Sequence, residues 1–258
     1  MTFQVLLATM NQHDDSVLNK MRVSSDILVC NQIDNEFCYH KYLKDGYSVR
    51  WYDFCERGVG LNRNNALMRA EADICLVADD DVEYCANYKE IIVQEFKKHP
   101  EADMILFNVE NYGYKTKKFM RIRQYNCGRF GGVRIAFKRL PIVKNAICFN
   151  LLFGGGARFS AGEDNMFIRD AIRKGLKVYA SPTTILRLND SRKSTWFEGY
   201  TEKFFSDLGT SYCFHYSIFA KICVVIQLIR HRKEFLKETT FKSAYRSALN
   251  GIKIYRNL

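Results

Sequence analysis

Short apolar runs alternate with amphipathic segments along the first two thirds of the chain. Two segments carry apolar residues at helical spacing, 61–70 and 88–99, and Pro100 stops the second. Runs with the length of strands, each followed by polar or turn residues, are Phe3–Ala8, Asp26–Cys30, Tyr47–Phe54, Ile74–Ala78 and Met104–Val109. This alternation predicts an α/β domain with a doubly wound, mainly parallel sheet, whose ligands lie beyond the carboxyl ends of the strands.

The pattern continues differently after residue 110. Residues 111–159 are basic, aromatic and interrupted by glycines, which predicts irregular strands and loops. Gly162–Asn165 then opens a helix with one apolar stripe, which includes Phe167 and Ala171, and Gly175 ends it. A last strand is expected at 176–180, before Pro182.

The end of the chain has a different character. The 258 residues carry a net charge of +11, and residues 211–258 contain nine Lys/Arg but two Glu. The strongly apolar run Tyr216–Ile229 leads directly into a basic flank. We therefore expect a globular domain at 1–210 and a helical appendage at 211–258. The appendage would either touch an anionic membrane surface, or pack on the domain or on another subunit.

Cysteine usage indicates a reducing compartment. The nine cysteines are scattered, odd in number and without CxxC pairs, which argues against disulfides and against a structural zinc site. No basic region precedes the first apolar run, so a cleaved signal peptide is not expected. The predicted location is the cytoplasm, with peripheral contact to the inner face of the cell membrane as an option for the appendage.

Three consecutive aspartates, Asp79, Asp80 and Asp81, follow the apolar strand that ends at Ala78. Adjacent carboxylates repel one another, and Mn²⁺ or Mg²⁺ would relieve the repulsion, since these ions take oxygen ligands from one or two carboxylates and from substrate phosphates. On a strand-end turn Asp79 and Asp81 can face one side, so Asp81 is the first expected ligand and Asp79 binds metal or nucleotide. A solvated acidic turn is the alternative.

Four motifs together resemble family 2 glycosyltransferases of the GT-A fold, as found in bacteria. They are Thr9-Met10-Asn11 after the first strand, GVGLNRNNAL at Gly58–Leu67, LVADDDV at Leu76–Val82, and GEDNMFIRDAIRKG at Gly162–Gly175. The resemblance implies a Rossmann-like nucleotide-diphospho-sugar transferase, with a nucleotide-sugar half at 1–110 and an acceptor half at 111–210. A metal at the aspartates would bridge the donor's diphosphate to the protein.

The resemblance also implies which residues surround the donor. Thr9, Asn11 and Asp80 are expected at the nucleotide, and the arginine and asparagine of the second motif, here Arg63 and Asn64, lie near the donor in this family. Arg63 would pair with phosphate or orient an aspartate through its planar fork of donors. A surface arginine on an amphipathic helix is the alternative.

The chain departs from the family where the second strand ends. Many members carry an aspartate pair there that meets the uracil base, whereas this chain has Asn31 and Gln32. An amide can still hydrogen-bond a pyrimidine edge. A UDP-sugar is the first expectation, and another nucleotide stays open.

Arg192, Lys193 and Trp196 are further candidates: the two cations would bind the diphosphate and the tryptophan the sugar. The alternative is a tryptophan in the core and two solvated charges.

The fourth motif supplies a carboxylate pair, Glu163 and Asp164. An acceptor hydroxyl is a poor nucleophile until a base removes its proton. In the resembling family the aspartate of this pair is the usual base, which points to Asp164, with Glu163 positioning the acceptor or the structure around it. The alternative role for Asp164 is to cap the helix that follows.

Together these features predict an inverting glycosyltransferase that transfers a sugar to a glycan or lipid-linked glycan. By family analogy the product would be a bacterial surface polysaccharide: capsule, exopolysaccharide or lipopolysaccharide. A metal-dependent nucleotidyl or phosphoryl transferase is one alternative, but it would need a glycine loop after the first strand, which Thr9–His13 does not supply. A basic nucleic-acid-binding protein is the other; against it, the cations crowd into the apolar appendage, and no nucleic acid is expected.

Overall fold

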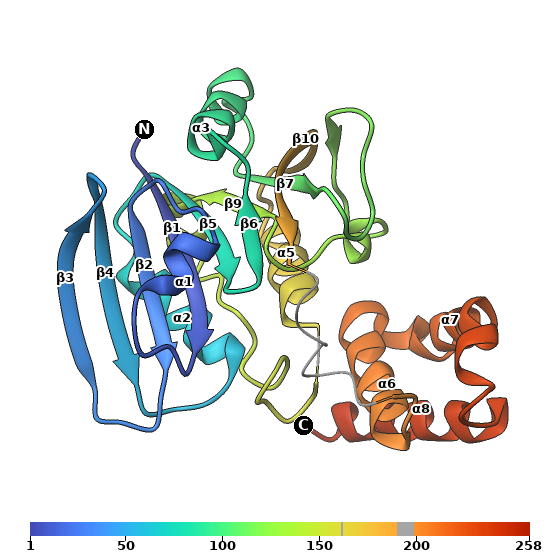
Figure 1. Ribbon diagram of the computed structural model, residues 1–258. Helices are drawn as coiled ribbons and strands as arrows, with labels where there is room; N and C mark the ends of the chain where they lie inside the picture. Colours follow the sequence, from blue (N-terminus) through green and yellow to red (C-terminus); the bar gives the residue numbers. More distant parts are fainter. Residues whose placement is uncertain (161, 190–198) are drawn as a thin grey trace. The chain divides into compact units, whose positions relative to one another are not determined.

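The computed structural model describes residues 1–160, 162–189 and 199–258, which divide into two compact units. The first unit comprises Met1–Leu151 and the segment from Glu163 to the end of the last strand (Figure 1). The second comprises Leu152–Gly162 and the described residues from 199 onward. Arg192, Lys193 and Trp196 lie outside the described residues.

In the described part of the first unit, ten strands form one mixed sheet in the order β3-β4-β2-β1-β5-β9-β7-β10-β6, with β8 paired to β10. The strands are β1 Phe3–Met10, β2 Ile27–Gln32, β3 Cys38–Lys44, β4 Tyr47–Phe54, β5 Ile74–Asp79, β6 Val82–Tyr84, β7 Met104–Val109, β8 Met120–Arg121, β9 Ile135–Lys138 and β10 Val178–Leu188. Four neighbours, β4, β2, β1 and β5, are parallel, so their carboxyl ends share one edge of the sheet. That edge carries the polar residues after β1 and the three aspartates after Ala78.

Apolar layers cover both faces of this sheet because successive side chains of a strand point to opposite sides. Val5 and Leu7 of β1 belong to one layer and Leu6 to the other. The first layer includes α1 and α3, and the second includes α2, α4 and α5. The helices are α1 Ser16–Lys20, α2 Val59–Arg69, α3 Tyr88–Lys98, α4 Arg139–Lys144 and α5 Glu163–Arg173.

The predicted strands and helices are confirmed, and so is the α/β fold class with helices at its carboxyl end, but the last strand does not end before Pro182: β10 passes through this residue and continues to Leu188. Four strands run antiparallel to a neighbour and so depart from the simple alternation. The edge strand β3 pairs antiparallel with β4, β9 lies antiparallel between β5 and β7, and β6 and β8 both pair antiparallel with β10. The sheet is therefore two parallel groups joined through an antiparallel strand, and β9 comes from the stretch whose elements the apolar pattern left undefined.

The second unit is helical and contains α6 Glu202–Tyr216, α7 Ala220–Phe235 and α8 Phe241–Arg256. Thr201 and Thr240 cap α6 and α8, each accepting the backbone N–H of the third residue of its helix. The segment 152–162 belongs here because the Ser160 hydroxyl donates to Asp207 of α6 at 2.6 Å. The boundary expected at 210/211 falls inside α6, so the helical unit begins before the apolar run that suggested it.

Two expectations from the sequence concern the pairing of the cysteines and the apolar run at Tyr216–Ile229. All nine cysteines lie among the described residues and none is disulfide-bonded. Among the residues that the structure describes, one stretch, Glu202–Phe235, has the length and hydropathy of a membrane span. The helix is interrupted at Ser217, whose φ is 47°. This stretch therefore forms two helices, α6 and α7, rather than one.

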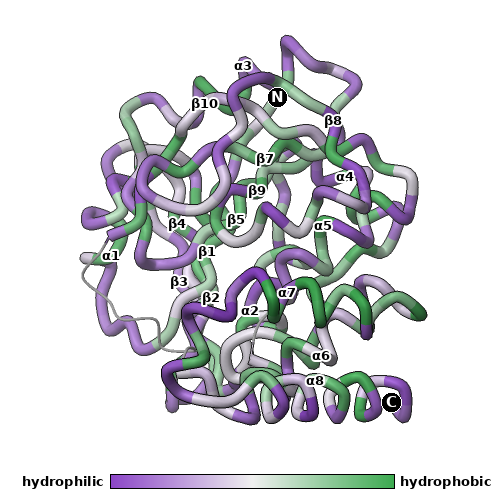
Figure 2. Tube along the Cα trace, turned by 90° about the vertical axis from the view of Figure 1, so that its right-hand side faces the viewer, coloured by the Kyte–Doolittle hydropathy of each residue, from purple (hydrophilic) through white to green (hydrophobic). Residues whose placement is uncertain are grey.

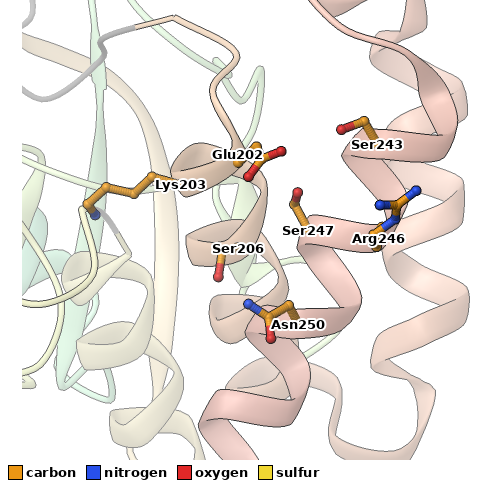
Figure 3. Close-up of a pocket in the computed structure, with 7 residues that line it drawn as sticks. All are labelled: Glu202, Lys203, Ser206, Ser243, Arg246, Ser247 and Asn250. Atoms are coloured by element: carbon orange, nitrogen blue, oxygen red, sulfur yellow. The ribbon is translucent and has the colours of Figure 1, made fainter.

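The backbones of α6 and α8 approach very closely at two glycines. A Cβ on Gly209 would lie 1.9 Å from the Ala248 carbonyl oxygen, and a Cβ on Gly251 would lie 1.8 Å from that of Ser206. The Thr210 hydroxyl donates to the Gly251 carbonyl at 3.2 Å across the same contact. An open polar groove of about 520 Å³ borders these helices (Figure 3), lined by Glu202, Lys203, Ser206, Ser243, Arg246, Ser247 and Asn250.

Gly251→Ala is expected to destabilise the helical unit because the added methyl group cannot fit without separating α6 from α8. Overpacking of this kind costs about 1–3 kcal/mol or more, despite alanine's higher helix propensity. Thermal unfolding measures the effect. Asn250→Ala, at an exposed position beside it, is the control and should change stability little. Equal melting temperatures for wild type and Gly251→Ala would contradict the close packing.

Candidate active site

A single buried arginine joins two of the sequence motifs. Arg63 lies on α2 with a side chain that is 4% exposed. Its Nη2 donates to both oxygens of Asp79, at 2.8 and 2.9 Å, where β5 ends. Its Nη1 donates to Glu163 at 2.8 Å and to Asp164 at 2.5 Å, at the start of α5. The planar fork thus fixes the aspartate strand end against the carboxylate pair of the fourth motif.

The charges of this cluster do not balance, since Arg63 faces three carboxylates. Their combined negative charge raises the pKa of Arg63 further above its usual range, although burial acts in the opposite direction. Burial raises the pKa of Asp164 to about 7, and the carboxylates of Glu163 and Asp79 act the same way, while Arg63 and a backbone N–H lower it. Asp164 therefore titrates close to neutral pH, the range in which a general base is most effective.

This raised pKa predicts a pH-dependent stability. Because the folded-state pKa of Asp164 lies above its unfolded value, the folded state binds more protons between pH 4 and pH 7, and stability falls as pH rises through that window. Asp164→Asn removes this titration. Melting temperatures measured between pH 4.5 and 8 should decline more steeply in wild type than in the variant. A steeper decline in the variant would show that Arg63 stabilises the ionised carboxylate instead.

A glycine loop completes the surroundings of Asp164. The N–H of Gly132 donates to the second Asp164 oxygen at 2.8 Å, and Gly132 has a φ of 68°, which favours glycine. Arg63 and Gly132 together hold both oxygens of the carboxylate in place. The sequence placed Gly132 among the glycines that interrupt residues 111–159 and assigned it no role, because nothing in the local pattern connects it with a motif 32 residues later.

Asp80 is tied to the loop after β1. Its Oδ2 accepts from the Thr9 hydroxyl at 2.6 Å and from the Gln12 side chain at 3.0 Å. Thr9 and Asp80 were predicted at the nucleotide, and the structure brings them together. Gln12 was not predicted; it belongs to the stretch between Asn11 and α1, where no periodic pattern marks it. Asn11 itself has a φ of 54° at the end of β1.

The amides at the end of β2 are engaged within the protein. Asn31 is buried; its amide donates to the Gln12 carbonyl and to Asp53, and its oxygen accepts the Gln12 N–H. Gln32 donates to the Gly58 carbonyl, just before α2. Both side chains therefore fasten the loops around the candidate donor site, and their contact with a nucleotide base stays a prediction.

Asn62 and Asn64 have comparable structural contacts. The Asn62 amide donates to the carbonyls of Thr9 and Cys30, which fastens α2 to the ends of β1 and β2. Asn64, predicted near the donor, holds the backbone of Phe149, donating to its carbonyl at 2.9 Å and accepting its N–H at 2.8 Å. The Phe149 ring in turn lies under the Arg63 guanidinium, 5.4 Å from its centroid.

A cavity of about 470 Å³ adjoins this region. Its lining comes from the loop after β1 and from β3 and β4, namely Gln12, His13, Asp14, Asp15, His40, Tyr42, Trp51 and Asp53. Gln12 connects the cavity with Asp80, so space for a nucleoside-sized group lies next to the aspartate turn.

The residues at the turn fit a hard divalent cation. No group of three or more His, Cys, Asp or Glu suited to a metal occurs in the described ranges. Mg²⁺ and Mn²⁺ bound with a diphosphate need only one or two protein carboxylates. Asp81 is partly exposed after β5, and Asp79, although paired with Arg63, keeps a side chain that is 32% exposed. With Asp80 they leave this edge strongly negative, which favours a cation.

Comparisons with known proteins place the chain in a family. The model of "Glycosyl transferase family 2" matches residues 39–176. The fold is similar to that of residues 1–349 of S. aureus TarS in complex with UDP-GlcNAc, with a TM-score of 0.67, 14% identity, and coverage of 99% of this chain and 80% of that one. The complex of the same fragment with UDP gives a TM-score of 0.62 at 14% identity, covering 98% and 81% of the two chains.

Full-length TarS from S. aureus is also similar, with a TM-score of 0.63 and 14% identity over 99% of this chain, which spans 49% of the TarS chain. A search of curated proteins gave no match. Identities this low show a shared fold only, whereas the family match covers more than half of the sequence and includes α2, the aspartate turn and the start of α5. The chain belongs to glycosyl transferase family 2, and it has the GT-A fold.

Proposed function

We propose that this glycosyltransferase moves a sugar from a nucleoside diphosphate to an acceptor hydroxyl in a single displacement that inverts the anomeric centre. The observation that carries the proposal is the joining, by buried Arg63, of Asp79 at the donor edge with Asp164 at the start of α5. A leaving-group site and a base are thereby held in one rigid cluster, as an in-line displacement requires.

In this reaction Asp164 removes the proton of the acceptor hydroxyl as its oxygen attacks the anomeric carbon. The new bond forms between that oxygen and the carbon, and the bond from the carbon to the diphosphate oxygen breaks. The fixed contacts from Arg63 and Gly132 orient the carboxylate, and its raised pKa gives it the proton affinity of an effective base. Glu163 shares Arg63 with Asp164 and acts through that contact.

We assign Asp81, with Asp79, to hold a Mn²⁺ or Mg²⁺ ion together with the donor's phosphates. When bound, the ion stabilises the negative charge that develops on the departing diphosphate. Asp80, Thr9 and Gln12 position the loop that faces the nucleotide, and we assign the adjoining cavity beside Trp51 to the nucleoside.

The donor we propose first is a UDP-sugar. TarS, whose fold is similar, was crystallised with UDP-GlcNAc and with UDP, and family membership favours sugar transfer over nucleotidyl transfer or nucleic-acid binding. For the acceptor we propose a glycan or lipid-linked glycan of a bacterial surface polysaccharide, made on the cytoplasmic side of the membrane.

Thermal unfolding with a panel of nucleoside diphosphates, each with and without Mn²⁺, tests the donor and metal assignments. A ligand of the folded state raises the melting temperature, by about 2–4 °C for each kcal/mol of binding linkage. UDP with Mn²⁺ should give the largest rise. Asp81→Asn should lose the Mn²⁺-dependent part, and Asp45→Asn, in the exposed β3–β4 turn, should keep it. If no nucleotide raises the melting temperature of the folded protein, the donor assignment is wrong.

A further inference from the structure

Helix α7 is apolar on two opposite sides. One side packs inside the helical unit through Ala220, Val224, Leu228 and Phe235. The other carries the isoleucine stripe, which we define as Ile222, Ile226 and Ile229 of α7 with Ile218 of the 3₁₀ turn just before it, and their exposed fractions are 61%, 51%, 47% and 75%. Figure 2 shows much of the α7 tube in the hydrophobic colour. The spacing of four, four and three residues places the stripe along one face.

The isoleucine stripe continues into a basic end on the same face. Arg230 and Lys233 follow Ile226 and Ile229 at helical spacing, Lys237 lies in the turn just after α7, and all three are exposed. Across the described residues none of these three cations forms an ion pair. The nearby acids are held elsewhere: Glu234 accepts from the Tyr200 hydroxyl and faces His231, and Glu238 accepts the Tyr200 N–H. The face is therefore apolar, then positive, without compensating carboxylates.

We propose that this face of α7 docks on an anionic lipid surface. The isoleucines would enter the boundary between headgroups and acyl chains, and the three cations would meet the headgroup phosphates. Charge complementarity favours this occupant over a second copy of the chain, because headgroup phosphates neutralise the three cations, whereas a second copy offers the same positive face without compensating carboxylates. A spanning role does not fit, since α7 has 16 residues, about 24 Å against the roughly 30 Å of a bilayer core.

Flotation of the full chain with vesicles tests the proposal, and its outcome does not depend on whether the protein transfers sugar. We expect binding to vesicles of phosphatidylcholine with phosphatidylglycerol, and weak binding to phosphatidylcholine alone. Ile222→Glu with Ile226→Glu should lower the bound fraction about tenfold or more, since the apolar anchor is lost. Met68→Glu, which replaces a side chain 70% exposed on α2, is the matched control and should bind like wild type.

The basic end has a separate variant. Arg230→Gln, Lys233→Gln and Lys237→Gln together should weaken binding to anionic vesicles, by about fivefold for each charge removed, and should leave the residual binding insensitive to salt. If the double isoleucine variant or the triple cation variant binds anionic vesicles as well as wild type does, the proposal is overturned. It is also overturned by a wild type that ignores vesicles but changes from dimer to monomer in light scattering when the isoleucines are replaced, since the stripe would then be a contact between copies.

Discussion

Asp164→Asn is expected to lower kcat by about 10²–10⁴-fold, the usual contribution of a general base. Asparagine has almost the same shape but accepts no proton from the acceptor hydroxyl. Its side-chain oxygen can still accept from Arg63 or from the Gly132 N–H, so the cluster is largely preserved. Binding of the nucleoside diphosphate should change little, because the residues assigned to the donor lie on β1 and the loop after it, on β3 and β4, and on β5 and the turn after it, and none of these elements carries Asp164. Steady-state rates and nucleotide-induced thermal shifts separate these two effects.

Asp170→Asn is the matched control for this variant. Asp170 lies on the same helix, is partly exposed and faces Arg173 at 3.5 Å. Its replacement should leave kcat within about twofold, as surface substitutions usually do. A rate for Asp164→Asn equal to that of the control would remove Asp164 from the mechanism. A variant that loses both rate and nucleotide binding would instead place Asp164 in the donor site.

Arg63→Met is expected to destabilise the fold by about 3–5 kcal/mol, because it leaves three carboxylates of a buried cluster without their cation. Arg63 donates to all three within 2.9 Å and is itself almost fully buried. Methionine fills similar space, so the loss reflects charge more than volume. Denaturant unfolding at neutral pH measures it. Lower pH should recover part of the stability, since protonation of the carboxylates removes their repulsion.

Two further arginine variants serve as comparisons for the stability loss of Arg63→Met. Arg57→Met removes an exposed partner of Asp34, and such pairs are worth about 0–1 kcal/mol. Arg63→Lys keeps the charge but loses the planar fork that reaches three carboxylates at once, so it should be intermediate. A loss for Arg63→Met as small as that for Arg57→Met would mean that the cluster does not depend on Arg63.

Much of the fold was predictable because its central strands are buried on both faces. Runs such as Ile74–Ala78 have no polar positions, and the polar residues that end them mark the carboxyl edge of the sheet. The aspartate turn and the Glu163-Asp164 pair were found for the same reason: charged residues at the ends of buried elements stand out. Arg63 is buried and orients aspartates, which excludes the surface arginine, while its pairing with a phosphate stays a prediction.

Other features depend on contacts that no local pattern encodes. The edge strand β3 is largely exposed and reads CYHKYLK, without an apolar run. The Gly132 contact with Asp164 spans 32 residues. Asn31, Gln32 and Asn64 were expected to face a ligand, which stays a prediction, and no local pattern announced their hydrogen bonds to backbone groups and side chains of neighbouring segments. An amide serves either purpose equally well, so the choice depends on three-dimensional neighbours rather than on residue type.

Release of nucleoside diphosphate from a panel of nucleotide sugars, measured with the full chain, Mn²⁺ and candidate glycan acceptors, examines the proposed reaction itself. We expect UDP to be released from a UDP-sugar, faster when the acceptor is present, and release to fall strongly in Asp164→Asn and in Asp81→Asn. Folded wild-type protein that releases no nucleoside diphosphate from any donor, or release undiminished in both variants, would show that the Asp81 and Asp164 sites do not perform sugar transfer.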